Sequence, residues 1–266
     1  MTIRDHVVMF SGGVGSWAAA KRVAARHGTE SMTLLFTDTR MEDADLYRFL
    51  TEAAADVGVP VTRLADGRDP WQVFADVKFL GNTRVDPCSR ILKRELAAQW
   101  LAAHCDPTTT RVYVGIDWTE EHRFTGLRAR RAAQGWTYEA PLCDRPYLSK
   151  GLMFDQLAEA GIRKPRLYDL GFTHNNCGGF CIKAGHAHFA RLLRTLPDRY
   201  AYHEQKEAEI RVRLGDVAIL RDRADAESSP LTLRAFRERL EAGGAFDEFA
   251  IGGCGCFIDD LDDAAA

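Results

Sequence analysis

Residues 7–24, VVMFSGGVGSWAAAKRVA, constrain the fold more than any other stretch of the chain. A short apolar run leads into a glycine-rich turn, and an alanine-rich segment follows at once. A strand that enters a helix through glycines is a common phosphate-binding arrangement, because the first amides of the helix point at the anion. The stretch therefore predicts a strand, a tight turn and a helix, with a phosphate group as the ligand of the turn.

The next segments repeat this alternation. Met32–Phe36 is again continuously apolar, as buried parallel strands are, and apolar residues at helical spacing follow it. Pro60–Leu64 and Arg111–Ile116 are two further strand candidates, with a predicted helix over Cys88–Leu101 between them. Repeated strand–helix units predict an α/β fold with a doubly wound, mostly parallel sheet, in which ligands bind at the carboxyl ends of the strands.

The chain changes character after about residue 145. Lys150–Ala160, Ala184–Leu196 and Pro230–Glu241 have helical periodicity, and the final GGCGCFIDDLDDAAA is acidic and low in complexity. We expect a nucleotide-binding α/β domain over residues 1–145. A helical region over residues 146–266 would carry cysteine pairs and end in a flexible acidic tail.

Composition excludes several classes of protein. At 266 residues and 46% hydrophobic content the chain can bury a large core, and its net charge of −3 lacks the basic excess of a protein that coats nucleic acid. No apolar run approaches the roughly 20 residues that span a bilayer, and the first residues lack a signal-peptide pattern. Seven cysteines, mostly in close pairs, suit reduced thiols for metal or redox chemistry. We therefore expect a cytoplasmic protein with no membrane partner.

The glycine turn fits two kinds of nucleotide site. Gly13-x-Gly15-x-x-Ala18 matches the dinucleotide fingerprint of Rossmann folds, and Asp38 follows about 20 residues later. A Walker loop is excluded, because no Gly-Lys-Ser/Thr follows the turn. The second kind of site begins at Ser11, whose hydroxyl would add a donor to a nest of backbone amides.

Three segments favour the second kind of site by resemblance. SGGVGS (residues 11–16) resembles the PP-loop, SGGxDS, of the ATP pyrophosphatase superfamily, with Gly15 where many members have aspartate. LLFTDTRMEDADLYRFL (residues 34–50) resembles a strand–turn–helix of phosphoadenylylsulfate (PAPS) reductases, and GIDWTEEHR (residues 115–123) resembles their later nucleotide-contacting segment. The resemblance covers roughly residues 7–184. It implies an adenine nucleotide alpha-hydrolase-like fold that binds ATP, with Mg²⁺ as its companion ion, or adenylylsulfate (APS) or PAPS.

The resemblance also implies roles for individual residues. The phosphates would be held by Ser11, Gly12, Gly13, Gly15 and Ser16. Phe36 and Asp38 would lie beside the nucleotide, where Asp38 contacts it or orders the neighbouring turn. Gly115 would let the nucleotide approach the sheet, and Arg123 would meet its phosphate or sulfate end. Lys93 is a further candidate for that anion.

Five cysteines lie in three separated segments. Cys177-Gly-Gly-Phe-Cys181 and Cys254-Gly-Cys256 are glycine-flanked pairs, and Cys88 begins a predicted helix, whose dipole favours a thiolate. DPCSRILKREL, around Cys88, resembles the Cys-Cys-x-x-Arg-Lys segment that helps to hold a [4Fe–4S] cluster in some reductases. The resemblance implies a cluster on Cys88, Cys177, Cys181 and one of Cys254 or Cys256.

Two alternatives to the cluster stay open. Zinc would be held by the thiolates of both pairs, with His174, His186 or His188 as nitrogen substitutes, although helix positions outside a metal site suit the last two histidines better. Otherwise one pair would cycle between thiol and disulfide. The remaining cysteines, Cys105 and Cys143, are predicted to be small buried hydrophobic residues.

These features favour an ATP-dependent sulfurtransferase that adenylates its acceptor and releases pyrophosphate. Arg123 and the thiols of Cys88, Cys254 and Cys256 would be its catalytic groups. An APS or PAPS reductase is the alternative, with a tail cysteine attacking the sulfate sulfur, although Phe257-Ile258-Asp259 stands where the reductases carry Glu-Cys-Gly-x-His. A non-catalytic, metal-stabilised nucleotide-binding module of a nucleic-acid modification or defence system is the third hypothesis.

Partners follow from charge and composition. Glu120–Arg131 and Arg163–Arg166 would form a basic strip for a tRNA or DNA acceptor, with Tyr168 or Trp136 stacking on a base, although solvated helix faces would explain the same residues. A sulfur donor would deliver sulfur to the thiols, or a reductant protein would reduce them. A homodimer is also compatible with the sequence.

Overall fold

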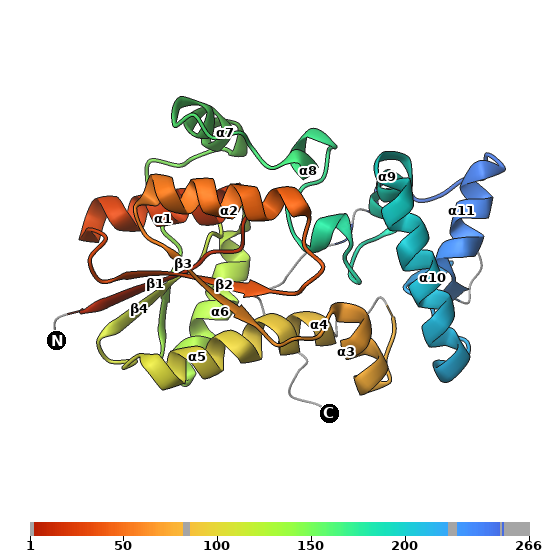
Figure 1. The fold of residues 1–266 in the computed structure, drawn as a ribbon, viewed down its shortest axis with the longest axis horizontal. Coiled ribbons are helices and arrows are strands. Elements are labelled where there is room, and N and C mark those ends of the chain that lie inside the picture. Colours follow the sequence, from red (N-terminus) through yellow and green to blue (C-terminus); the bar gives the residue numbers. More distant parts are fainter. Residues whose placement is uncertain (1–2, 82–85, 223–227, 251, 253–266) are drawn as a thin grey trace.

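The computed structural model describes residues 3–81, 86–222, 228–250 and 252. Its centre is a parallel five-stranded sheet in the order β3-β2-β1-β4-β5 (Figure 1). The strands are β1 (Asp5–Met9), β2 (Met32–Asp38), β3 (Val61–Ala65), β4 (Thr110–Tyr113) and β5 (Thr137–Glu139). The predicted α/β class and its four strands are confirmed, whereas β5 was not predicted, because it is only three residues long.

Helices connect the strands and continue beyond the sheet. Those up to residue 169 are α1 (Val14–His27), α2 (Ala44–Val57), α3 (Pro70–Val77), α4 (Pro87–Ser89), α5 (Leu96–His104), α6 (Glu121–Ala133), α7 (Lys150–Glu159) and α8 (Arg166–Asp169). The later ones are α9 (His186–Thr195), α10 (Pro197–Leu214) and α11 (Leu233–Glu241), with a two-stranded antiparallel pair, β6 (Leu220–Asp222) and β7 (Ser229–Leu231), between α10 and α11. A π-helical segment, Arg90–Glu95, joins α4 to α5, so the helix predicted over residues 88–101 is present with one wider turn.

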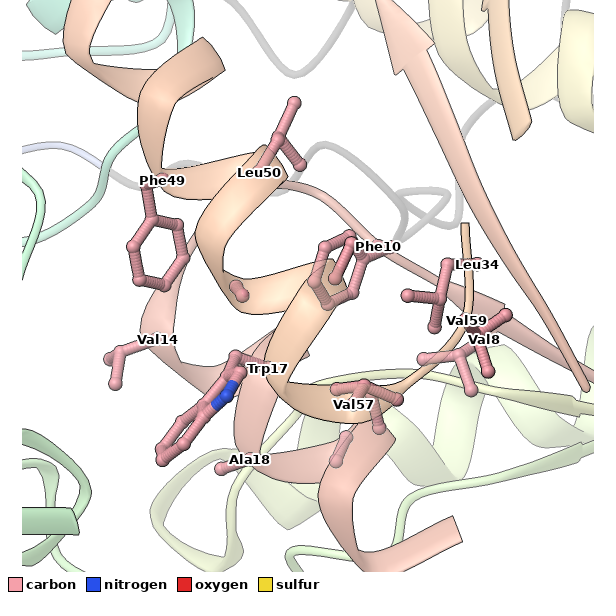
Figure 2. Close-up of a cluster of buried hydrophobic side chains, with 14 of the residues drawn as sticks. Val8, Phe10, Val14, Trp17, Ala18, Leu34, Phe49, Leu50, Val57 and Val59 are labelled. Atoms are coloured by element: carbon pink, nitrogen blue, oxygen red, sulfur yellow. The ribbon is translucent and has the colours of Figure 1, made fainter. Parts of the chain in front are cut away.

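The continuous apolar strands are buried on both faces, as predicted. Val8 and Phe10 pack toward α1 and α2 in one hydrophobic cluster, which also includes Met153 of α7 (Figures 1 and 2). Val7 and Met9 point to the opposite face and pack with residues of α5 and α6. Alternate side chains of β1 therefore supply two separate cores, which fixes its register in the middle of the sheet.

The strand order places a crevice at the carboxyl ends of β1 and β4. The chain runs outward from β1 to β2 and β3, then returns to the other side of β1 through β4 and β5. Connections on the two sides diverge at this point, so the strand ends there are left open to a ligand. The glycine turn follows β1 and Gly115 follows β4, so the two lie at the same crevice.

A second hydrophobic cluster joins α3 to the helices after residue 166. It contains Trp71, Phe180, Phe189 and Phe236, and α9 packs against both α10 and α11. The helix α10, the longest of the described helices, was not predicted. Its buried residues are Tyr200, His203, Glu207 and Ile210. They keep helical spacing, but two of the four are polar, so the apolar periodicity is masked.

The predicted boundary at residue 145 stays a prediction. The helix α7 follows it directly and packs on α1, so the layer of helices over the sheet continues past this point. Within the described residues, no helix is long and apolar enough to cross a membrane.

His203 should make the protein sensitive to acid. Its Nδ1 accepts a hydrogen bond from Trp71 at 3.0 Å, and burial lowers its pKa to about 3. The unfolded chain, with a pKa of 6.5 at this residue, takes up the proton first, so stability falls as the pH drops below that value. Between about pH 7 and about pH 5, the wild type should lose about 2 kcal/mol of unfolding free energy through this residue.

The test is urea unfolding at both pH values. His203→Phe keeps a ring on Phe180, whose centroid lies 4.0 Å away, and should remove most of this pH dependence. His122→Gln, at an exposed position of α6, is the control and should behave as the wild type. Equal pH dependence in wild type and His203→Phe would contradict the assignment.

Candidate functional site

The glycine turn between β1 and α1 has a backbone that only glycine accommodates at its second position. Gly12 has a φ of +78°, and a Cβ there would lie 2.8 Å from Cγ of Leu46. Gly13 is the N-cap of α1 and has no side chain to cap the helix. The first residues of α1, Val14 to Ser16, line the crevice, so the end of the helix that carries the partial positive charge of its dipole lies where an anion can bind.

The backbones of Gly15 and Gly115 touch. A Cβ on Gly15 would lie 2.8 Å from the carbonyl oxygen of Gly115, and a Cβ on Gly115 would lie 2.7 Å from the backbone nitrogen of Ser16. Position 15 therefore has no room for the aspartate of the SGGxDS pattern. The close approach joins the start of α1 to the end of β4.

The two serines of the turn differ. Ser16 is buried, and its Oγ donates a hydrogen bond to the carbonyl of Gly13 at 2.8 Å. Ser11 lines the crevice, and its hydroxyl bonds to no other residue in the described part of the chain. Ser11 is therefore the hydroxyl that is available to a phosphate, while Ser16 holds the shape of the turn.

Two side chains from the C-terminal half close over the turn. Nδ2 of Asn175 donates to the carbonyl of Gly12 at 2.8 Å. Tyr168 accepts a hydrogen bond from the amide of Val14 through its hydroxyl at 3.3 Å. Asn175 is 1% exposed, and its Oδ1 has no hydrogen-bond partner among the residues that the structure describes. A buried acceptor fixed in this way is set to receive a donor from a ligand.

These residues line one cavity. The glycine turn and the start of α1 contribute Ser11, Gly13, Gly15 and Ser16, and the segment after β4, up to the first turn of α6, contributes Gly115, Asp117, Glu120 and Arg123. The later segments contribute Lys150, Tyr168, His174, Asn175 and Asn176. Six predicted nucleotide-contacting residues are thus together: Ser11, Gly13, Gly15, Ser16, Gly115 and Arg123. Gly12 lies in the same turn, and its carbonyl accepts the hydrogen bond from Asn175.

The cavity carries two cations beside a neutral histidine. Lys150 donates from Nζ to the carbonyl of Thr173 at 2.9 Å, and Arg123 forms an ion pair with Glu120. Burial and the nearby Lys150 lower the pKa of His174 to about 4, so its imidazole is uncharged near neutral pH. Positive charge at one side and amides at the other suit a ligand with several anionic oxygens.

Asp38 and Phe36 lie away from this cavity. The Asp38 carboxylate is fully buried and accepts hydrogen bonds from the Tyr47 hydroxyl, the Arg40 amide and the Arg63 guanidinium. It therefore orders the turn after β2, and its oxygens are already engaged, which disfavours the ribose contact of the dinucleotide interpretation. Phe36 is buried in the core and packs edge-on against Tyr47.

Three of the predicted thiols meet in a second, smaller pocket. Cys88, Cys177 and Cys181 line it together with Lys93 and Lys183. The pocket adjoins the first cavity through the chain itself, because Asn176 lines the cavity and Cys177 follows it directly. Cys88 and Cys177 are far apart in the sequence. They come together because α4, which carries Cys88, packs against α3, and α3 contributes to the second hydrophobic cluster.

Cys177 is held from two sides. Its amide donates to the buried Glu42 carboxylate, and its Sγ lies 3.9 Å from Nζ of Lys93. Lys93 in turn lies 3.7 Å from Glu42, so this lysine serves the thiol pocket and does not line the nucleotide cavity. Cys177 has a φ of +50°, an uncommon conformation for a residue with a side chain, and such positions are frequent at functional sites.

The metal prediction is not completed by the described residues. No group of three or more histidine, cysteine, aspartate or glutamate side chains among them is placed to hold a metal ion. Cys254 and Cys256 lie outside the described residues. His186 and His188 bond to the carbonyls of Arg221 and Gly179, as ordinary helix positions do.

The two lone cysteines are partly buried. Cys105 and Cys143 pack against the cluster around α5 and α6, although they were predicted to be buried and are only partly so. Burial raises the pKa of Cys105, and it raises the pKa of Cys143 to about 11, so neither thiol is ionised near neutral pH.

The predicted basic strip is largely engaged within the protein. Arg163 pairs with Asp45 at 3.0 Å, and Arg166 forms two hydrogen bonds with Asp43. Trp136, one of the predicted stacking residues, is partly buried against the cluster around α5 and α6. Tyr168, the other, lies inside the nucleotide cavity.

Sequence reasoning missed Lys150, Asn175 and Asn176 as cavity residues. Asn175 and Asn176 lie in HNNC, in which the histidine and the cysteine were predicted as candidate metal ligands. Two adjacent asparagines before a glycine-rich thiol segment were the available signal, since buried amides need hydrogen-bond partners. Lys150 had no signal beyond its charge.

No protein-family model and no curated protein matches the chain. Among solved structures, the chain is similar to a PAPS reductase from Candida auris in a phosphate complex, with a TM-score of 0.43 and 13% identity over 63% of this chain and 78% of that one. It is also similar to an NH₃-dependent NAD synthetase from Campylobacter jejuni in complex with a nitrate ion, with a TM-score of 0.41 and 14% identity over 80% of this chain and 85% of that one. Both likenesses concern the α/β fold, and the site is interpreted from its own geometry.

Proposed function

We propose that the protein binds ATP in the cavity at the ends of β1 and β4, adenylates an acceptor and transfers sulfur to it. The phosphates would meet the first amides of α1, the Ser11 hydroxyl, Lys150 and Arg123. Mg²⁺ would accompany the nucleotide, as it commonly does for phosphate chains. PP-loop enzymes of the ATP pyrophosphatase superfamily use this kind of turn, and the SGGVGS sequence resembles theirs.

One observation carries the proposal: the hydrogen bond from Asn175 to Gly12. This bond ties the segment that contains Cys177 to the turn that would hold the phosphates. Asn176, between Asn175 and Cys177, lines the same cavity as the turn. The turn proposed to bind phosphates and the thiol pocket are therefore connected by consecutive residues, which supports a reaction that couples the two chemistries.

The proposed reaction has two steps. An acceptor oxygen attacks the α-phosphorus of ATP, the bond to the bridging oxygen breaks, and pyrophosphate leaves with its negative charge stabilised by the amides and cations of the cavity. A sulfur nucleophile then attacks the acceptor carbon, the carbon–oxygen bond breaks, and AMP leaves. The sulfur comes from a persulfide on a donor protein: a thiolate of this chain attacks its outer sulfur and becomes a persulfide, and the donor leaves as a thiol. After the attack on the acceptor carbon, a second thiol breaks the S–S bond that still joins the sulfur to this chain. This releases the thiolated acceptor and leaves a disulfide in the protein, which a reductant protein then reduces.

Cys177 is the described thiol best placed to carry that sulfur. The Lys93 ammonium 3.9 Å from its Sγ favours a negatively charged sulfur, and Glu42 fixes its backbone. Cys88 lines the same pocket. The catalytic roles of Cys88, Cys254 and Cys256 stay predictions, as do a dimer and a cytoplasmic location.

A [4Fe–4S] cluster or a zinc ion would need ligands beyond the described residues. Cys88, Cys177 and Cys181 share a pocket, but they do not form a metal-holding group by themselves. No step of the proposed reaction depends on a metal at the thiols. Anaerobic purification with metal analysis and a visible spectrum would decide between cluster, zinc and free thiols.

Two other hypotheses have distinct outcomes. Reduction of APS or PAPS would depend on the tail cysteines and would release sulfite and an adenine nucleotide without any pyrophosphate. A non-catalytic module would bind ATP tightly and leave it unchanged. A tRNA or DNA acceptor for the sulfur transfer is compatible with both cations of the cavity.

ATP–pyrophosphate exchange in the presence of candidate acceptors tests the proposal. Ser11→Ala should weaken ATP binding about tenfold, because it removes one charge-assisted hydrogen bond of about 1.5 kcal/mol, and it should leave the unfolding free energy nearly unchanged. Ser31→Ala, at an exposed position before β2, should match the wild type in both measurements. ATP affinity that is unchanged in Ser11→Ala would remove this hydroxyl from the site.

A further inference from the structure

Two aromatic rings are exposed and stacked on each other beside the cavity. Trp118 is 42% exposed and Tyr147 is 43% exposed. Their ring centroids lie 5.3 Å apart, with 24° between the ring planes. We call this pair the aromatic platform. About two-fifths of each residue is open to solvent, so the stacked pair offers a flat surface on which another ring can stack.

The platform is fixed in place by its neighbours. Nε1 of Trp118 donates to the carbonyl of Leu148 at 3.3 Å, which ties the loop after β4 to the loop before α7. The carboxylate of Asp117 accepts from the Thr119 amide at 2.9 Å and caps the short 3₁₀ turn that carries Trp118. A ligand that stacks on these rings would therefore meet a surface that is already ordered.

The platform lies at the edge of the nucleotide cavity. Trp118 stands in the chain between Asp117 and Glu120, and both of these line the cavity. Tyr147 precedes Lys150, another lining residue, by three positions. A group stacked on the rings would therefore lie next to the phosphates proposed for the glycine turn.

The charges around the platform favour an anionic partner. The Arg145 guanidinium lies 5.2 Å from the centre of the Tyr147 ring, and Lys150 lines the cavity. Neither cation forms an ion pair with a carboxylate of the described residues. Asp144, in contrast, is paired with Arg26 at 2.8 Å, and Glu120 with Arg123.

We propose that the aromatic platform binds an unpaired base of a single-stranded nucleic acid, with Arg145 and Lys150 meeting its phosphates. Stacking on an exposed ring and neutralising the backbone are the two contributions that bind single strands without base-specific contacts. The proposal rests on the proposed function, since the strand would be the acceptor of the sulfur. It places the stacking on Trp118 and Tyr147 instead of Trp136 and Tyr168.

The experiment is a fluorescence anisotropy titration of the full chain with short labelled oligothymidylate and oligouridylate. The double variant Trp118→Ala/Tyr147→Ala should bind the oligonucleotides at least about tenfold more weakly than the wild type does, because it loses the stacking of one base. Tyr202→Ala is the matched control, because Tyr202 is 41% exposed on α10, and it should bind as the wild type does. Trp118→Phe/Tyr147→Phe keeps both rings and should restore most of the affinity. The two oligonucleotides distinguish a DNA partner from an RNA partner.

ATP binding to the same variants separates this proposal from the proposed function. The double alanine variant should bind ATP as the wild type does. A parallel loss of ATP affinity would show that the rings hold the adenine of ATP, which would overturn the platform as an acceptor site. Failure of both oligonucleotides to bind the wild type, or equal binding by wild type and the double alanine variant, would overturn it as well. Absence of ATP binding in the wild type would instead refute the proposed function.

Discussion

Asn175→Asp is expected to raise the dissociation constant for ATP at least about a hundredfold, which corresponds to about 3 kcal/mol. The aspartate has the same shape but cannot donate to the Gly12 carbonyl, which accepts from Nδ2 at 2.8 Å in the wild type. The site is 1% exposed, so the new carboxylate would lie close to a carbonyl oxygen with little water around it. It would also repel the phosphates proposed for the turn. Calorimetric titration with ATP measures the effect.

Asn176→Asp is the comparison that separates charge from anchoring. Asn176 lines the same cavity but is only partly buried, and the bond between Asn175 and Gly12 is intact in this variant. We expect Asn176→Asp to lose clearly less ATP affinity than Asn175→Asp does. Sulfur transfer should fall in Asn175→Asp even at saturating ATP, because the segment that carries Cys177 is no longer tied to the turn. Equal ATP affinities in the two aspartate variants would show that the anchor to Gly12 has no role in binding.

Gly115→Ala is expected to lower the unfolding free energy by about 3 kcal/mol and to weaken ATP binding at the same time. The added Cβ would lie 2.7 Å from the carbonyl carbon of Gly15 and from the backbone nitrogen of Ser16, and 2.8 Å from Cα of Ser16. All three atoms belong to the backbone, so no side chain can rotate away to relieve the contact. The start of α1 must shift from the end of β4, and the amides that face the cavity shift with it.

Urea unfolding and ATP titration of Gly115→Ala measure the two effects. Gly151→Ala, in the first turn of α7, is the control, since a Cβ there would meet only the Ser149 Oγ at an ordinary 3.7 Å. It should leave ATP binding unchanged and stabilise the helix by up to about 1 kcal/mol. If Gly115→Ala matched the wild type in both measurements, the close approach of the two glycines would not be needed for the site.

The same contact explains a departure from the family pattern. The PP-loop pattern has aspartate where this chain has Gly15, and the carbonyl of Gly115 occupies the space that the Cβ of any larger residue would need. The two glycines are therefore matched to each other. Position 15 therefore supplies no carboxylate, and among the described residues Asp117 and Glu120 are the acidic ones that line the cavity.

The local sequence determined which segments form the strands and the glycine turn, and at which edge of the sheet the turn and Gly115 meet. Four strands were predicted to within about three residues of β1, β2, β3 and β4. The central strands β1, β2 and β4 are largely buried, which gives them their apolar sequence, whereas β3 at the edge of the sheet is only partly buried. The glycine turn could be predicted because its backbone conformation is available to few residues other than glycine. The meeting of Ser11, Gly115 and Arg123 in one cavity followed from the parallel topology.

Only the tertiary structure decided which distant side chains complete the site. Asn175 contacts Gly12 across 163 positions of the chain, and Lys93 contacts Glu42 and Cys177 instead of lining the cavity at the glycine turn. Such contacts depend on how the helices after β5 pack on the sheet, which no local pattern encodes. The pairing of Asp38 with Arg63 has the same origin, because it depends on β3 lying beside β2. The sequence thus determined the glycine turn through backbone geometry, whereas the fold decided the thiol and amide neighbours through packing between distant segments.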